Sequence, residues 1–142
     1  MSGLRNGYRL VEGPPTTEDY LDLRVRAGLT PKREAQAAAA LSGSWAACHV
    51  RHDAQDRSVA MGRVIGDGGW YFHVVDMAVL PDHQRRGLGS AVLKYLLEQI
   101  RARAPERAFV SLLADSPGRP LYARHGFVET APDSIGMALL LG

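Results

Sequence analysis

Residues 79–91 read VLPDHQRRGLGSA, and this stretch decides how the chain is interpreted. It follows residues 70–80, where aromatic and β-branched side chains favour a strand that ends at Pro81. A polar turn then leads to Gly87 and Gly89. From there, apolar side chains at three- and four-residue steps predict a helix over residues 87–104. The stretch therefore predicts a strand, a glycine-containing turn and a helix.

This turn is suited to binding an anion. The first turn of a helix presents unpaired backbone N–H groups and the positive end of the helix dipole. Gly87 and Gly89 allow the backbone to approach a phosphate closely. A Gly-x-Gly after a strand also occurs in ordinary strand-to-helix turns. Two other phosphate motifs are excluded, because a dinucleotide fingerprint needs glycine where Val92 stands and a P-loop needs lysine where Ser90 stands.

The remaining pattern predicts a single mixed α/β domain over residues 1–142, with an antiparallel first half. Helices are expected after the N-cap candidates Thr16 and Thr17, from Thr30-Pro31 onward, and over residues 119–125. Other strands are expected as follows: residues 8–12, 45–51, 58–65 and 108–113, with closing strands at 127–129 and 135–141.

Composition excludes several classes of protein. The 17 basic and 15 acidic side chains nearly balance, which argues against a dedicated nucleic-acid binder. Cys48 is the only cysteine, so the chain can form neither an intrachain disulfide nor a cysteine-based metal cluster. No apolar run approaches the ~18 residues of a membrane span, and the first six residues lack a signal-peptide core. We expect a cytoplasmic protein without a metal, a nucleic-acid partner or a membrane partner.

Two motifs together resemble a known family. Residues 84–89, QRRGLG, resemble the Gln/Arg-x-x-Gly-x-Gly/Ala signature of the GNAT superfamily of N-acetyltransferases. Residues 121–127, LYARHGF, resemble its second motif, Leu-Tyr-x-x-x-Gly-Phe. The element order also matches, so the resemblance covers nearly the whole chain. It implies the GNAT fold, with a mixed, largely antiparallel central sheet of six to seven strands, splayed between the fourth and fifth strands and flanked by about four helices.

The resemblance also implies acetyl-CoA as the cosubstrate. The backbone of Met77, Ala78 and Val79 would contact the pantetheine arm. Two departures lie near the second motif, because Asp115 stands where Asn is common and Gly118 where Ala is usual. An ionised aspartate accepts hydrogen bonds but donates none, so it cannot make a contact that needs the amide donor. Around the pyrophosphate, the implied site residues are Gln84, Arg85, Arg86, Gly87, Leu88, Gly89 and Ser90.

Members of this superfamily usually work by direct attack of the amine in a ternary complex. A backbone N–H near Met77 or Ala78 would stabilise the oxyanion. Tyr122 matches the tyrosine that often serves as general acid, and a phenol pKa of ~10 lies above the ~8.5 of a thiol. The alternative for Tyr122 is a core tyrosine on a short helix.

His73 is the candidate general base. Strand alternation predicts that it shares a face with Val75, Met77 and Val79. The catalytic carboxylate of the histone-acetylating branch lies at about this position, and a histidine there suits neutral pH. The alternatives are a side chain that only fills space, or a water chain as the base. Asp76 is a weaker candidate, since it points to the opposite face unless a β-bulge re-aims it.

The sequence does not name the acceptor. Aromatic side chains would suit an apolar amine and carboxylates a cationic one, although each is more often a surface or core residue. A small-molecule amine is preferred, and the alternatives are a protein or peptide acetyltransferase and an inactive acyl-CoA-binding module. A homodimer is left open. The acceptor candidates are Tyr20, Trp70, Tyr71, Asp19, Asp22 and Glu34.

Overall fold

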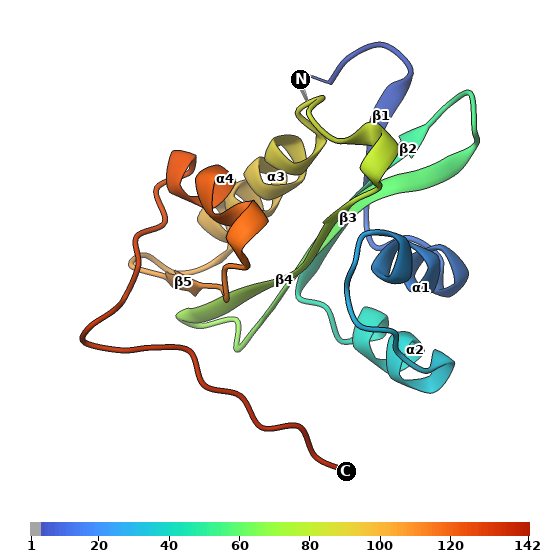
Figure 1. Cartoon of the computed structure of the whole chain (residues 1–142). Helices are drawn as coiled ribbons and strands as arrows, with labels where there is room; N and C mark the ends of the chain where they lie inside the picture. The colour runs from blue at the N-terminus through green and yellow to red at the C-terminus, as the bar shows by residue number, and fades with distance from the viewer. Residues whose placement is uncertain (1–3) are drawn as a thin grey trace. The chain divides into compact units, whose positions relative to one another are not determined.

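The computed structural model describes residues 4–142, and its strands form one sheet in the order β1-β2-β3-β4-β5 (Figure 1). The first four strands are antiparallel neighbours, and β5 lies parallel to β4. This arrangement confirms the predicted mixed, largely antiparallel sheet. The strands are β1 (Tyr8–Glu12), β2 (Ala46–His52), β3 (Arg57–Gly66), β4 (Tyr71–Val79) and β5 (Phe109–Ser111).

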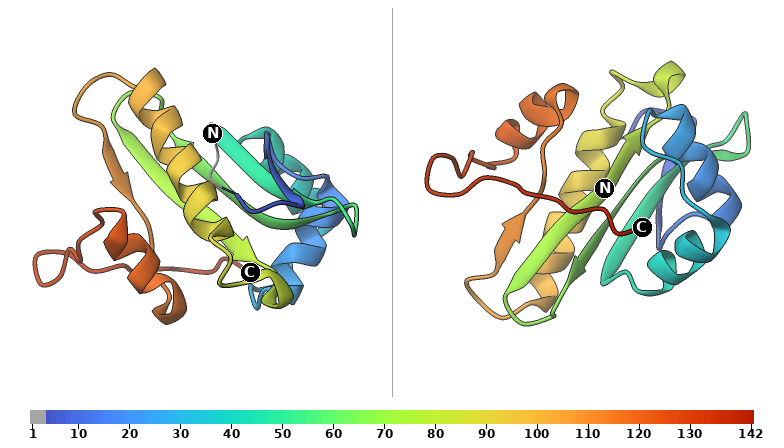
Figure 2. Two further views of the ribbon diagram at one scale, coloured as in Figure 1. Left: turned by 90° about the horizontal axis from the view of Figure 1, so that it is seen from above. Right: turned by 60° about the horizontal axis from the view of Figure 1, so that its bottom comes forward.

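The described residues form four α-helices, as predicted: α1 (Thr17–Arg26), α2 (Glu34–Ser42), α3 (Leu88–Arg103) and α4 (Arg119–Arg124). Figure 2 shows α3 on one face of the sheet and α1 with α2 on the other. Thr16 caps α1, because its Oγ1 accepts a hydrogen bond from the N–H of Asp19 at 3.1 Å. The buried face of α3 consists of Leu88, Val92, Leu93, Leu96, Leu97 and Ile100.

The chain forms two compact units. The first ends at Leu112 and contains the sheet, α1, α2 and α3. The second is Leu113–Gly142, which contains the short 3₁₀ turn Ser116–Gly118 and α4.

The predicted closing strands at residues 127–129 and 135–141 are wrong, so the sheet has five strands rather than six to seven. Val128, Ile135, Met137 and Leu139 are each more than two-thirds exposed. A strand has no hydrogen bonds within itself, so an apolar alternation becomes a strand only where a neighbouring strand pairs with it. Neither segment pairs with a strand among the described residues.

The predicted start of the second helix is also wrong. This helix begins at Glu34 rather than at Pro31. The carbonyl oxygen and Oγ1 of Thr30 accept hydrogen bonds from the Arg24 guanidinium, at 2.9 and 3.0 Å, and these bonds hold residue 30 in the loop. The side chain of Gln36 then accepts from the N–H of Arg33 at 3.0 Å, which favours a helix start at this later position.

Candidate active site

The sheet opens between β4 and β5. Only the first three residues of β4 pair with β5, and the last pair is His73 with Ser111. From Val74 to Val79, the edge of β4 on that side has no strand partner among the described residues. The predicted splay between the fourth and fifth strands is therefore present, and it leaves backbone N–H and C=O groups along this edge for another partner.

A β-bulge lies within the same open stretch. Val75 pairs with Arg63 and Ala78 with Met61, so Asp76 and Met77 together face the single residue Gly62. Asp76 has a left-handed φ of 59°. The bulge that the sequence left as an option is thus present.

The bulge corrects the predicted face of His73. An added Cβ on Gly62 would meet Met77 Sδ at 2.6 Å and the α3 side chain Val92 at 2.7 Å, so Met77 lies on the α3 face. Val75 is opposite Arg63, whose side chain reaches Ala40 of α2 on the other face. His73, two residues before Val75, shares that second face and does not share one with Met77. The extra residue at the bulge reverses the alternation beyond Val75.

The turn before α3 has the backbone geometry of a phosphate cradle. Arg85 and Gly87 have φ values of 63° and 80°, and Gly87 is the N-cap of α3 without any side-chain cap. An added Cβ at Gly87 would meet no atom within 4 Å, so the space over the helix start is open. The N–H groups of Leu88 and Gly89 belong to the first helical turn, where the helix itself offers them no acceptor.

Side chains around this turn tie it to the sheet. Gln84 Nε2 donates to the carbonyl oxygen of Val79 at 3.1 Å, which connects the turn to the end of β4. Arg86 Nη1 donates to the Tyr8 hydroxyl at 2.5 Å, and His83 Nδ1 lies 2.7 Å from the same oxygen. Arg86 is therefore anchored on β1, although it is exposed, as is Arg85.

Sequence reasoning missed the buried His83. Burial, followed by the charges of His52 and Arg86, lowers its pKa, so the ring is neutral at neutral pH. In the sequence, His83 is distinguished only by its place two residues before Arg85 and Arg86, and that position does not indicate burial.

His73 has a defined hydrogen-bond partner at the point where β4 and β5 separate. Its Nδ1 lies 2.8 Å from Ser111 Oγ, and Ser111 Oγ donates to the Tyr71 hydroxyl at 3.3 Å. In the tautomer that donates Nδ1–H to Ser111 Oγ, the lone pair of His73 is on Nε2. Burial lowers the pKa of His73, so the neutral ring persists to lower pH than usual.

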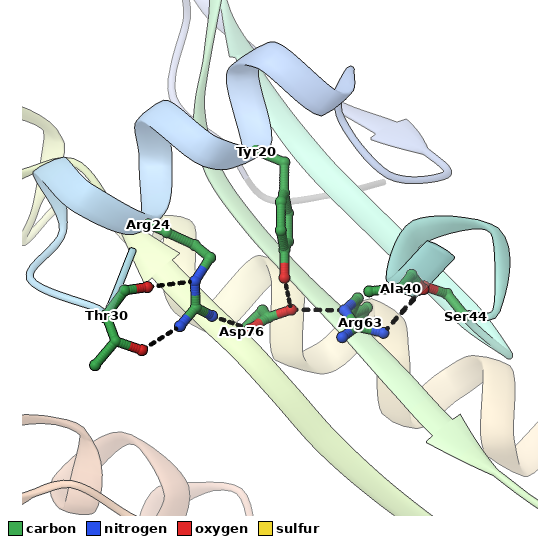
Figure 3. Close-up of polar contacts among 7 residues, drawn as sticks. All are labelled: Tyr20, Arg24, Thr30, Ala40, Ser44, Arg63 and Asp76. Carbon is green, nitrogen blue, oxygen red and sulfur yellow. Dashed lines mark hydrogen bonds and ion pairs between the residues drawn. The ribbon is translucent and has the colours of Figure 1, made fainter. Parts of the chain in front are cut away.

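Most of the carboxylates that the sequence suggested, Asp76 as a weaker candidate base and the others near the acceptor, already have charged partners. Asp76 is held by Tyr20, Arg24 and Arg63, so it is an ion-paired residue rather than an available base (Figure 3). Asp22 pairs with Arg26 and Arg57, and Asp19 with Arg51. The side chains of Glu34, Trp70 and Tyr71 are exposed.

In the unit Leu113–Gly142, Tyr122 lies on α4 and Asp115 precedes the 3₁₀ turn. Burial and then the charge of Asp115 raise the pKa of Tyr122. The departure to Gly118 has a physical reason, because an added Cβ would lie 2.8 Å from the Tyr122 ring. The rings of Phe127 and Tyr122 pack edge to face, with their centroids 6.1 Å apart.

The residues of the splay, the turn and α4 lie within a segment that matches a known family. Residues 44–129, more than half of the chain, match the acetyltransferase (GNAT) domain model. The chain belongs to the GNAT acetyltransferases. The resemblance found in the sequence is confirmed.

Two solved structures extend the similarity of this GNAT protein along the chain. One, from meticillin-resistant Staphylococcus aureus and named a probable acetyltransferase of unknown function, is 38% identical, with a TM-score of 0.88. The match covers 94% of this chain and 99% of that one. The other, a GNAT family acetyltransferase from Streptococcus pneumoniae, is 27% identical, with a TM-score of 0.74, and the match covers 94% and 98% of the two chains.

A curated relative is longer than this GNAT protein. The uncharacterized N-acetyltransferase ycf52 of Porphyra purpurea is 29% identical over 85 residues, which are 60% of this chain and 47% of the relative. The chain therefore spans about half the length of the curated relatives it matches.

Within residues 4–142, no three His, Cys, Asp or Glu side chains form a group that could hold a metal ion. In the same range, no helix is long and apolar enough to cross a membrane. Burial raises the pKa of Cys48 to about 12, so this thiol is a structural group rather than a nucleophile.

Proposed function

We propose that this GNAT protein transfers the acetyl group of acetyl-CoA to a primary amine of a small molecule, by direct attack in a ternary complex. The observation that carries the proposal is the open edge of β4 running toward the uncapped, glycine-led start of α3. The edge of β4 at Met77, Ala78 and Val79 would pair with the pantetheine arm. Together these features fit a long ligand with an amide-containing arm and a pyrophosphate.

The turn would hold the pyrophosphate mainly through its backbone. The N–H groups of Leu88, Gly89 and Ser90 lie at the helix start, where an anion is favoured. The exposed Arg85 adds charge, while Gln84 and Arg86 fix the turn against β4 and β1. Asp115 remains a proposed contact at the start of its 3₁₀ turn.

The chemistry requires two proton transfers. The amine nitrogen forms a bond to the thioester carbon, the carbon–sulfur bond breaks, and His73 Nε2 accepts the proton that the amine releases. Tyr122 donates its proton to the departing thiolate, and solvent restores both side chains. The N–H groups of Met77 or Ala78 stabilise the charge on the carbonyl oxygen. A raised pKa keeps Tyr122 protonated, so it remains a competent acid across the neutral range.

Exposed aromatic side chains beside His73 favour a small apolar or aromatic acceptor. Tyr71 contacts both Trp70 and Phe109, with ring centroids 5.3 and 5.4 Å apart, and all three are exposed. An assay of thiol release across aromatic amines, alkyl diamines and lysine peptides tests the choice. Turnover highest with an aromatic amine supports the proposal, whereas turnover with peptides alone would favour a protein acetyltransferase. Binding of acetyl-CoA without any turnover would favour an inactive module.

The acid side of the pH profile tests His73. Burial lowers the pKa of His73 below its usual ~6.5, so we expect kcat/KM to fall only as pH drops below that value. The acceptor should be an aromatic amine that stays neutral over the whole range. His73→Gln should lower kcat about 100-fold and remove the acid limb.

His49→Gln is the matched control for this profile, since burial also lowers the pKa of His49, which lies on β2 and bonds to Gly13. We expect its acid limb to be unchanged. If the limb persisted in His73→Gln, the base would be another group or water.

A single domain over residues 1–142 and a cytoplasmic location stay predictions, and a homodimer stays an open alternative.

A further inference from the structure

The carboxylate of Asp76 is the centre of a buried ionic cluster behind the β-bulge (Figure 3). Oδ1 accepts a hydrogen bond from Arg24 Nη1 at 2.5 Å. Oδ2 accepts from Arg63 Nε at 2.6 Å and from the Tyr20 hydroxyl at 2.5 Å. The Asp76 side chain is 8% exposed, so one carboxylate has two guanidinium partners and a phenol in a nearly dry site.

Each partner is itself held in place by another element. Arg24 extends from α1 and also bonds to Thr30 in the loop before α2. Arg63 extends from β3 and also bonds to Ala40 of α2 and to Ser44. The pKa of Tyr20 is raised, mainly by burial and to a smaller extent by the hydrogen bond to Asp76. The hydroxyl therefore keeps its proton and remains a donor. The Asp76 carboxylate therefore joins α1, α2 and β3 to one residue of β4.

That residue is also where the backbone of β4 is unusual. Asp76 is in the left-handed region at φ 59°, and Asp76 with Met77 opposes only Gly62. Aspartate and asparagine visit this region more readily than most residues, but it still disfavours a side chain. A bulge needs support from its surroundings, and the three donors supply it through the side chain.

We propose that Asp76, held by Tyr20, Arg24 and Arg63, is a positioning residue that fixes the bulge and so aims the N–H group of Met77. The N–H of Leu80 donates to Val59 of β3, so the N–H of Ala78 also faces β3 and that of Met77 faces the open edge. This role rests on the proposed function, in which a backbone N–H at this point stabilises the oxyanion. Asp76 touches no reacting atom and acts through the backbone that follows it. Removing a donor from the cluster should lower kcat more than acetyl-CoA affinity, because the pyrophosphate turn lies beyond the bulge.

Tyr20→Phe tests the proposal with the least risk to folding, since both ion pairs of Asp76 remain. We expect kcat to fall about 10-fold, with KM for acetyl-CoA within twofold of the original value. Tyr95→Phe is the matched control, because it also removes one hydroxyl-to-carboxylate hydrogen bond, to Glu12, away from the bulge. The positioning role of Asp76 is supported if the two variants have similar melting temperatures and only Tyr20→Phe has a lower kcat. Equal kcat values would overturn it.

Asp76→Asn tests whether charge holds the bulge. Asparagine keeps the shape and tolerates φ > 0, but it leaves the two guanidinium groups without a carboxylate. We expect a larger loss of kcat than in Tyr20→Phe in the folded fraction, which circular dichroism measures. Full activity in Asp76→Asn would mean that backbone preference alone maintains the bulge, and it would overturn the proposal.

A measurement independent of turnover separates this proposal from the proposed function. In Tyr20→Phe, the amide ¹H–¹⁵N signals of Met77 and Ala78 should shift more than those of Tyr71 and Phe72 at the far end of β4. Absent turnover in the unsubstituted protein would refute the proposed function. Unshifted signals at Met77 and Ala78 would refute the positioning role, whether or not the protein turns over.

Discussion

Gly87→Val should weaken acetyl-CoA binding at least about 100-fold, which corresponds to the loss of one or two charge-assisted hydrogen bonds. Gly87 has φ 80°, and an added Cβ there would meet no atom within 4 Å. A valine there would place its branched side chain over the N–H groups of Leu88 and Gly89, where the pyrophosphate should lie. Isothermal calorimetry with acetyl-CoA measures the loss.

The same substitution also strains the backbone, so it requires a control with equal strain. Left-handed dihedral angles cost a residue with a Cβ roughly 1–2 kcal/mol. Gly13 has φ 92°, and an added Cβ would likewise meet no atom within 4 Å, but it lies in the turn after β1. Gly13→Val should lose similar stability on thermal melting and keep its affinity for acetyl-CoA. Equal affinities in the two variants would remove the phosphate role of the turn.

Tyr122→Phe should lower kcat about 100-fold, the usual scale for loss of a general acid, with little change in acetyl-CoA affinity. The phenol lies on α4, and burial together with Asp115 raises its pKa, so it remains protonated at neutral pH. Steady-state thiol release with the best amine measures kcat. The phenyl ring of the variant preserves the contact with Phe127, so the fold should be retained.

Tyr95→Phe serves as the control, because this tyrosine lies on α3 and its hydroxyl bonds to Glu12 of β1. It should leave kcat unchanged. A Tyr122→Phe variant with full turnover would assign the proton transfer to water or to another side chain.

Much of the fold could be predicted from local patterns. The strand, turn and helix from Tyr71 to Arg103 were predicted within one or two residues, because β-branched periodicity, Pro81 and the two glycines all indicate the same boundaries. The N-cap at Thr16 was also predicted, since a capping side chain acts within four residues.

Features that depend on distant partners could not be predicted in the same way. The side-chain alternation of β4 reverses at the bulge, and pairing with β3 sets where the bulge lies. The prediction that Met77 and His73 share a face of the sheet was therefore wrong. The donors to Asp76 come from residues 13 to 56 positions away. Residues 135–141 have a strand-like apolar pattern, but no strand pairs with them within the described residues, so the pattern alone was insufficient.

The central claim is that the turn from Gln84 to Ser90 binds the pyrophosphate of acetyl-CoA, and calorimetry with two donors tests it most directly. S-acetyl-pantetheine keeps the thioester and the pantetheine arm but lacks the pyrophosphate and the phosphoadenosine. The unsubstituted protein should bind one acetyl-CoA per chain, at least about 100-fold more tightly than S-acetyl-pantetheine. In Gly87→Val this difference should shrink, because acetyl-CoA loses its pyrophosphate contacts and S-acetyl-pantetheine has none to lose. Equal affinity of the unsubstituted protein for the two donors, or no binding of acetyl-CoA, would contradict the claim.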